Sequence, residues 1–270
     1  MTARQVERLA IAGELLAGGD GDPRWNNLGY WRDANEYTAA CQALARRHGE
    51  VARLGNGDRV LELGCGHGVA LSLWCDAFAV TEAVGLDCRA SGYNTEHRRV
   101  VGRFDEPLPD SLSRYRFDVI LCVDAAYHAS SLSALLASVI PVLEREGRLA
   151  LSLLVRPDDY HARPLFQRLL HQWLLKTAGL PDASFCDHSA VQHQLLACGF
   201  LDVVCEDLSE DVFPGFYHWV QRRHRELVFS RRWSRGWLKI RITAIWCYWM
   251  HRKKLGRYLL VSATRRGIAQ

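Results

Sequence analysis

The chain has 270 residues, of which 49% are hydrophobic and 24% charged, and its formal net charge is +4. This length fits one large domain with a cap, or at most two domains. The mild charge argues against a nucleic-acid enzyme, so we expect no nucleic-acid partner. Nine cysteines without a CxxC pair favour reduced thiols in the cytoplasm. No apolar stretch reaches the roughly 18 residues that a membrane span needs.

The first element is an amphipathic helix expected over residues 3–17, where apolar side chains recur at three- and four-residue steps. The run 18–23 is rich in glycine and ends it. Residues 25–31 then form a loop with three large aromatics, Tyr30 and Trp31 among them. Loops seldom hold so many aromatics unless they close over something apolar. This aromatic loop therefore either covers a ligand or plugs one end of the core.

Strands and helices alternate through the rest of the chain. Asp33 and Glu36 form a capping-box pattern, which predicts a helix over 34–53. Apolar runs predict strands at 59–63, 83–86, 100–104, 117–123, 148–155, 200–205 and 257–263. Amphipathic patterns predict helices over 69–78, 132–145, 160–178 and 189–197. This alternation is typical of an α/β protein with a doubly wound sheet.

The most informative stretch is Val-Leu-Glu-Leu-Gly-Cys-Gly-His-Gly at residues 60–68. Its glycines recur at two-residue spacing, namely Gly64, Gly66 and Gly68. They let bare backbone approach a ligand, and the helix that follows points its free N–H groups at the same place. A dinucleotide fingerprint needs its third glycine where this chain has Val69, and Glu62 would repel a pyrophosphate. The pattern therefore predicts a nucleotide without phosphates, with an NAD-dependent dehydrogenase as the weaker alternative.

Residues 62–68 resemble the first motif of the class I S-adenosylmethionine-dependent methyltransferases, because they combine a strand, an acid and the G-x-G-x-G spacing. The resemblance implies a Rossmann-like sheet of seven strands, with S-adenosylmethionine as methyl donor. It implies that Asp87 accepts hydrogen bonds from both ribose hydroxyls and that Asp105 lies on the adenine side. The cofactor-binding residues expected on this basis are Tyr30, Trp31, Glu62, Gly64, Cys65, Gly66, Gly68, Asp87, Cys88, Asp105, Cys122, Val123 and Asp124.

Residues 117–128 resemble the fourth strand and the following loop of the small-molecule branch of that family. This branch includes tocopherol, sterol and macrolide-sugar methyltransferases. The run Asn-Leu-Gly-Tyr-Trp at 27–31 resembles the same branch, in which it covers the cofactor. His128 follows a strand's carboxyl end, where open α/β sheets bind ligands, and histidine suits proton transfer near neutral pH. We expect His128 and Tyr127 at the reacting centre, with His128 either a base or a group that only packs or orients its neighbours.

Residues 212–255 hold five of the nine tryptophans and eleven Lys or Arg residues, against one acid, Glu226. They form a helical cap, line a pocket for a bulky apolar acceptor, or touch an anionic membrane surface. We divide the chain into an N-terminal helical cap or lid at 1–57, an S-adenosylmethionine-binding core at 58–211, and a basic, Trp-rich cap with the last strand at 212–270.

The resemblance implies an enzyme that transfers a methyl group in line to a small, apolar or natural-product-like acceptor, as O- or C-methylation. The rival from another class is a noncatalytic S-adenosylmethionine-binding protein on the same fold. We expect no metal, because the spacing of the candidate ligands is wrong for a zinc site; they are Cys186, His188, His193 and Cys198.

Overall fold

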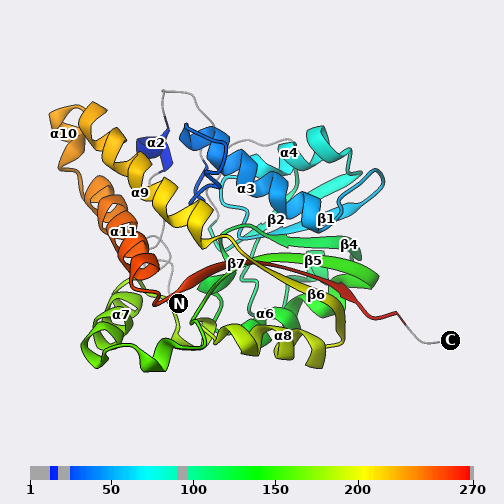
Figure 1. Cartoon of the computed structure of the whole chain (residues 1–270). Coiled ribbons are helices and arrows are strands. Elements are labelled where there is room, and N and C mark those ends of the chain that lie inside the picture. Colours follow the sequence, from blue (N-terminus) through cyan, green and yellow to red (C-terminus); the bar gives the residue numbers. More distant parts are fainter. Residues whose placement is uncertain (1–12, 18–24, 90–96, 268–270) are drawn as a thin grey trace.

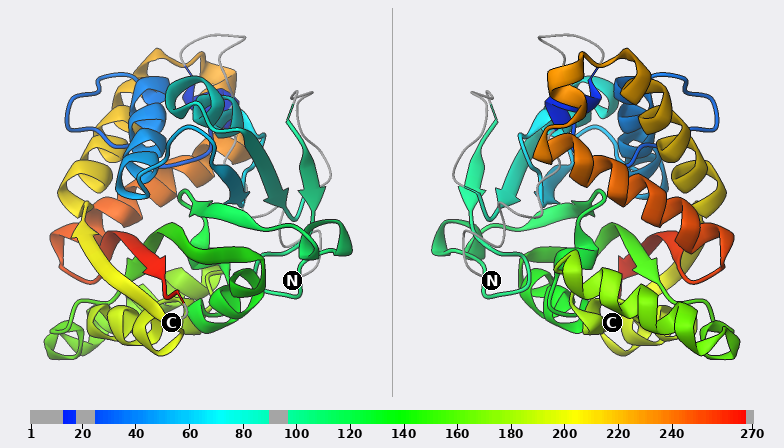
Figure 2. Two further views of the ribbon diagram at one scale, coloured as in Figure 1. Left: turned by 90° about the vertical axis from the view of Figure 1, so that its right-hand side faces the viewer. Right: turned by 90° about the vertical axis from the view of Figure 1, so that its left-hand side faces the viewer.

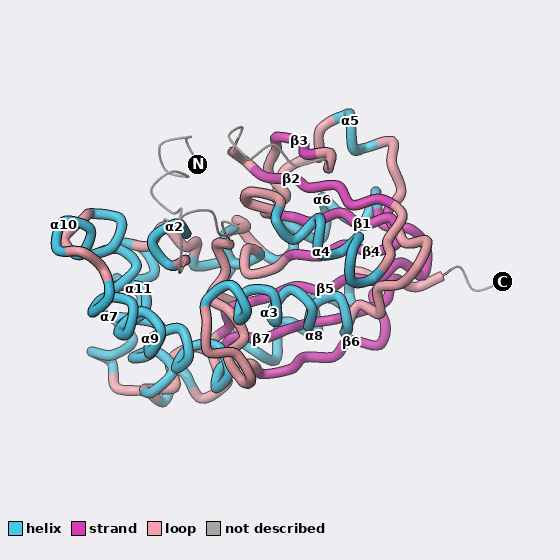
Figure 3. The backbone as a smooth tube through the Cα atoms, turned by 90° about the horizontal axis from the view of Figure 1, so that it is seen from above, coloured by secondary structure: helices cyan, strands magenta, loops and turns pink. Residues whose placement is uncertain are grey.

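The computed structural model describes residues 13–17, 25–89 and 97–267, so most of the helix expected over 3–17 lies outside the described residues. Over this part of the chain, seven strands form one sheet in the order β3-β2-β1-β4-β5-β7-β6 (Figure 3). Neighbours pair in parallel except at β7, which is antiparallel to β5 and β6. The doubly wound, seven-stranded sheet is therefore confirmed. The strands are β1 (Arg59–Leu63), β2 (Glu82–Asp87), β3 (Arg99–Val101), β4 (Phe117–Cys122), β5 (Leu143–Val155), β6 (Phe200–Asp207) and β7 (Arg257–Arg265).

Helices cover both faces of the sheet (Figure 1). Leu44 of α3 and Trp74 of α4 belong to the buried cluster on one face, and Leu135 of α6 and Val191 of α8 belong to the cluster on the other. The sheet is therefore buried on both sides, as the almost continuously apolar β4 requires. The described α-helices are α2 (Gly13–Leu16), α3 (Tyr37–Val51), α4 (Val69–Phe78), α5 (Asp110–Ser113), α6 (Leu132–Val139), α7 (Leu165–Thr177), α8 (His188–Ala197), α9 (Ser209–Glu226), α10 (Phe229–Arg232) and α11 (Arg235–Arg252).

The helix expected over 132–145 is wrong in its second half. α6 ends at Val139, and a short 3₁₀ turn at Ile140–Val142 follows it. Pro141 lies in this turn, where its missing N–H and its ring prevent a further α-helical turn. β5 consequently begins at Leu143, five residues earlier than the sequence suggested.

The capping box expected from Asp33 and Glu36 is also wrong. α3 begins at Tyr37, and its N-cap Glu36 makes no side-chain cap bond. Tyr37 is buried, and its hydroxyl lies 3.2 Å and 2.9 Å from the carbonyl oxygens of Trp25 and Asn27. These contacts, rather than a cap, fix the start of α3 and attach the aromatic loop to it.

The C-terminal helices stand over the carboxyl ends of the parallel strands. α11 leads into β7, whose first residue Arg257 pairs with Val155 at the carboxyl end of β5. Figures 1 and 2 show α9, α10 and α11 gathered at this end of the molecule, with α7 beside them. α9 and α11 pack together, and the rings of Tyr217 and Tyr248 stack with centroids 4.4 Å apart. Among the described helices, none is long and apolar enough to cross a membrane.

α9 meets the aromatic loop in a close contact at Gly215. A Cβ added to Gly215 would lie 2.2 Å from the Cβ of Trp31. The Trp31 ring packs on Trp219 with centroids 5.8 Å apart, and the Trp31 backbone N–H donates to the carbonyl oxygen of Asp211 at 2.8 Å. The loop is thus held from two sides, by α3 and by α9.

Gly215→Ala is expected to lower the free energy of unfolding by about 1–3 kcal/mol, the range for overpacking, although alanine alone favours a helix. Gly55→Ala is the matched control, because nothing lies within 4 Å of its added methyl group. Urea unfolding of both variants measures the effect. Wild-type stability of Gly215→Ala would mean that the loop moves aside at no cost.

Candidate functional site

The carboxyl ends of β1, β2 and β4 surround a pocket of about 170 Å³. Most of the residues expected at the cofactor or the reacting centre line it, namely Glu62, Gly64, Cys65, Gly66, Asp87, Cys88, Asp105, Val123, Asp124, Tyr127 and His128. The other expected residues lie outside its lining, namely Tyr30, Trp31, Gly68 and Cys122. Gly68 is the N-cap of α4, and Cys122 is buried in the hydrophobic core. The aromatic loop does reach the pocket, but through Trp25, Asn26 and Asn27.

The glycine turn brings bare backbone to the pocket. Gly64, Gly66 and Gly68 have φ angles of 67°, 57° and 76°, which side-chain-bearing residues rarely adopt. A Cβ on Gly64 would also lie 2.5 Å from the Cβ of Ala125. Arg99 stabilises the turn, because its Nη2 donates a hydrogen bond to the carbonyl oxygen of Gly66 at 2.5 Å. A ligand can therefore lie directly against the main chain here.

Glu62 places a buried carboxyl at the floor of the pocket. Burial raises its pKa to about 8, although a hydrogen bond from Trp74 Nε1 at 3.2 Å acts to lower the pKa. A cationic group on the ligand would favour the ionised carboxylate and form an ion pair with it. The site is therefore better suited to an ammonium-bearing ligand than to a phosphate.

Asp87 is held at the end of β2 by two main-chain donors. Its carboxylate accepts from the N–H of Gly66 and from the N–H of Arg89, each at 2.9 Å. The Arg89 guanidinium adds a third bond, from Nε at 3.0 Å. A ribose diol that binds Asp87 must therefore share this carboxylate with Arg89 or displace it.

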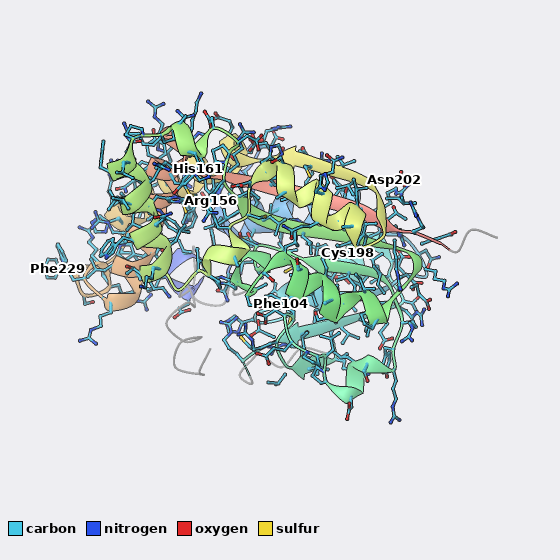
Figure 4. All side chains as sticks on the ribbon, turned by 90° about the horizontal axis from the view of Figure 1, so that it is seen from below. Phe104, Arg156, His161, Cys198, Asp202 and Phe229 are labelled. Carbon is cyan, nitrogen blue, oxygen red and sulfur yellow. The ribbon has the colours of Figure 1, made fainter. Side chains whose placement is uncertain are left out.

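Asp105 joins two of the loops that border the pocket. It accepts from Arg103 Nη2 and from the backbone N–H of Ser130, both at 2.7 Å. Burial acts to raise the pKa of Asp105, but these bonds and the charge of Arg103 together lower it. Phe104, which directly precedes Asp105, also lines the pocket, and Figure 4 labels its position in the molecule. The side expected to bind adenine thus combines an ionised carboxylate with an aromatic ring.

Asp124 is committed to partners within the protein. Its carboxylate accepts from the backbone N–H of Leu28 at 2.7 Å and from the hydroxyls of Tyr127 and Tyr258 at 2.9 Å and 2.8 Å. Burial raises its pKa to about 7, although these hydrogen bonds act to lower it. Its backbone has a φ of 55°, in the left-handed region. Asp124 therefore connects the aromatic loop, the loop after β4 and the last strand at one point of the pocket wall.

His128 brings a neutral imidazole to the pocket. Burial lowers its pKa to about 4, and the positive charges of Lys239 and Arg89 act in the same direction. Its Nδ1 is buried and has no hydrogen-bond partner among the described residues, and the same holds for Oδ1 of Asn26. Both residues line the pocket, so a bound ligand can supply these missing partners. The carboxylates and the bare backbone together fit a phosphate-free, cationic nucleoside.

Sequence patterns alone missed several lining residues, and only some of them carried a signal. Asn26 lies in the aromatic loop, which was singled out, and His67 lies within the glycine turn. Arg89 and Arg103 reach the pocket because they pair with Asp87 and Asp105, and no sequence pattern announces such a pair. The remaining lining residues that were missed are Trp25, Asn27, Val69, Ala70, Phe104 and Ala125.

The solved structures that share this fold include two that match almost the whole chain. The mycolic acid cyclopropane synthase CmaA1, complexed with SAH and CTAB, matches with a TM-score of 0.74 and 16% identity, over 96% of this chain and 94% of that one. Geranyl diphosphate C-methyltransferase from Streptomyces coelicolor A3(2) matches with a TM-score of 0.69 and 13% identity, over 98% of each chain. Both matches extend over almost the whole of this chain, so the fold shared with these two proteins includes the C-terminal helices as well as the sheet.

The sequence comparisons give the family. Erythromycin 3''-O-methyltransferase of Saccharopolyspora erythraea is 24% identical over 241 residues, which cover 83% of this chain and 78% of that protein. The family described as methyltransferase domain matches residues 30–259, which is well over half of the chain. This match also disfavours the dehydrogenase alternative. The chain therefore belongs to the methyltransferase-domain family and is an S-adenosylmethionine-dependent small-molecule methyltransferase.

Proposed function

We propose that this enzyme methylates a small apolar or natural-product-like acceptor on oxygen or carbon. The observation that carries the proposal is the apolar part of the pocket wall that the cofactor residues leave free. Trp25 and the Tyr127 ring contribute to it, and His128 lines the same pocket. An apolar wall with few polar groups favours an apolar ligand held in one orientation. The relative from Saccharopolyspora erythraea is named for the 3''-O-methylation of erythromycin, a natural product, which supports the same class of acceptor.

Each part of the pocket has a separate task in this proposal. S-adenosylmethionine supplies an electrophilic methyl group on its sulfonium sulfur. Glu62 and the glycine turn hold the amino-acid end of that ligand, and Asp87 holds its ribose. Tyr127 and His128 lie on the acceptor side, where neutral His128 takes the proton that a hydroxyl acceptor loses. Alignment of the two reactants can supply on the order of 7–11 kcal/mol of the lowered barrier.

Transfer of labelled methyl from S-adenosylmethionine to the components of a cell extract tests the acceptor class. We expect the label in small molecules that partition into organic solvent, and mass spectrometry of the labelled product then separates an O-methyl from a C-methyl group. Label confined to protein, nucleic acid or strongly polar metabolites would contradict the proposal. A cytoplasmic location and membrane contact through residues 212–255 stay predictions.

Asp87→Ala is expected to weaken binding of S-adenosylhomocysteine about tenfold to hundredfold, because hydrogen bonds to a charged group are worth about 1.5–3 kcal/mol each. Isothermal titration calorimetry measures the affinity, and NAD titrated in parallel should not bind. Asp76→Ala, at an exposed position on α4, is the matched control. Unchanged affinity of Asp87→Ala would remove this carboxylate from the cofactor site.

A further inference from the structure

α7 turns its apolar face away from the rest of the protein. Its buried residues are His171 and Leu175. Phe166 and Trp173 are 67% and 61% exposed, and three leucines of the same helix, at positions 165, 169 and 170, are also exposed. At 100° per residue these five positions fall on one side of the helix, opposite His171 and Leu175. α7 is therefore an amphipathic helix whose apolar side faces solvent rather than the core.

α10 and α11 continue this surface. α11 packs beside α7 through the rings of Trp246 and His171, whose centroids lie 6.1 Å apart. Phe229 and Trp233 are 77% and 60% exposed, and Ile242 on α11 is 61% exposed. Figure 2, on its right-hand side, shows α11 and α7 on the same side of the molecule, and Figure 4 shows Phe229 at its outer end. We call the exposed apolar side chains of α7, α10 and α11 the outer cap face.

Within the helices that carry the outer cap face, the charged side chains have one sign. The segments 163–181 and 227–255 contain no acidic residue, whereas Lys and Arg recur in both. Arg231, Arg235 and Arg252 are exposed and form no ion pair within the described part of the chain. The surface therefore combines exposed aromatic and aliphatic side chains with these three arginines, which no carboxylate pairs within the described residues.

We propose that the outer cap face docks on the surface of an anionic lipid bilayer. Trp, Phe and Leu side chains insert at the boundary between headgroups and acyl chains, and Lys or Arg beside them attract anionic lipids. A second copy of the chain fits less well, because a two-fold contact would set the same basic surface against itself without acids to pair with it. The proposal goes beyond methyl transfer and does not depend on it.

Flotation with vesicles tests the proposal on the full chain. We expect the protein to float with phosphatidylcholine vesicles that contain phosphatidylglycerol, and about tenfold less with phosphatidylcholine alone, because each basic residue near an anionic surface strengthens binding. Salt at about 1 M should release it, since the Debye length then falls to about 3 Å. Absence of binding to acidic vesicles at low salt, or equal binding to neutral vesicles, would overturn the proposal.

Two pairs of substitutions locate the surface. Phe166→Gln with Trp173→Gln, and separately Arg231→Glu with Arg235→Glu, should each reduce binding to acidic vesicles about tenfold or more. Val204→Gln is the control, because Val204 is 59% exposed but lies on β6. Unchanged affinity for S-adenosylhomocysteine shows that a variant is folded. Wild-type binding by both pairs, or a dimer in solution that the same substitutions dissociate, would assign the surface to another occupant.

Discussion

His128→Ala is expected to lower turnover about 10²–10⁴-fold, the usual contribution of a general base, while the affinity for S-adenosylhomocysteine stays within a few-fold. The reason is the position of the ring, which lies in the pocket with a buried Nδ1 that no described residue satisfies. Initial rates with the identified acceptor and calorimetry with S-adenosylhomocysteine separate the two effects. Turnover within a few-fold of wild type would exclude His128 as the base.

A second substitution distinguishes proton transfer from positioning. His128→Gln keeps a polar side chain of similar reach but cannot take up a proton, so it should be as slow as His128→Ala if the imidazole is a base. Recovery of most of the rate by His128→Gln would instead indicate that the ring only positions its neighbours. His193→Ala, at an exposed position on α8, controls for the loss of a histidine elsewhere.

The pH dependence of the rate follows from the same burial. An unshifted histidine loses its base form below about pH 6.5. Burial lowers the pKa of His128 to about 4, so its base form persists at more acid pH. Comparison of the pH–rate profiles of wild type and His128→Gln identifies the acid limb that depends on His128. The midpoint of that limb should lie well below pH 6.5. The same shift in the pKa of His128 lowers the free energy of unfolding as pH falls from about 6.5 toward 4, because the unfolded chain binds a proton in this range and the folded protein does not.

The local parts of the site could be predicted from the sequence. The glycines at 64, 66 and 68 indicate a tight turn by their spacing alone, and the resemblance to the methyltransferase family pointed to Asp87 at the end of the next strand. Both features depend on neighbours in the chain, and the structure places Gly64, Gly66 and Asp87 in one pocket. The apolar runs likewise located the strands, because a sheet that is buried on both faces leaves little choice of residue.

Contacts between distant segments could not be predicted in this way. Leu28 and Tyr258 lie 96 and 134 residues from Asp124 in sequence, yet all three meet at one carboxylate. The amphipathic pattern of residues 165–177 indicates that its apolar side faces the protein, whereas in the structure that side faces solvent. The early end of α6 at Val139 shows a third limit, since the apolar pattern continues past the point where Pro141 stops the helix.

Asp124→Ala is expected to lower the free energy of unfolding by about 3 kcal/mol or more. The substitution leaves the N–H of Leu28 and the hydroxyls of Tyr127 and Tyr258 without their acceptor, and each buried donor left unpaired costs about 1–3 kcal/mol. Alanine is also strained at the φ of 55°. Urea unfolding measures the loss, and amide exchange at Leu28 should become faster. Wild-type protection of that amide would show that Asp124 does not hold the aromatic loop.

Two milder variants and the pH dependence separate the causes of this loss. Tyr258→Phe removes one hydrogen bond and should cost only about 0.5–1.5 kcal/mol, whereas Asp124→Asn keeps an acceptor and tolerates the left-handed backbone. Burial raises the pKa of Asp124 from 3.8 to about 7, so between these values the folded protein holds a proton that the unfolded chain has released. The stability that this carboxyl contributes is therefore full below about pH 4 and is lost as pH rises through about 7. The stability advantage of wild type over Asp124→Asn should narrow over that interval, and a constant advantage would mean that the carboxyl does not titrate there.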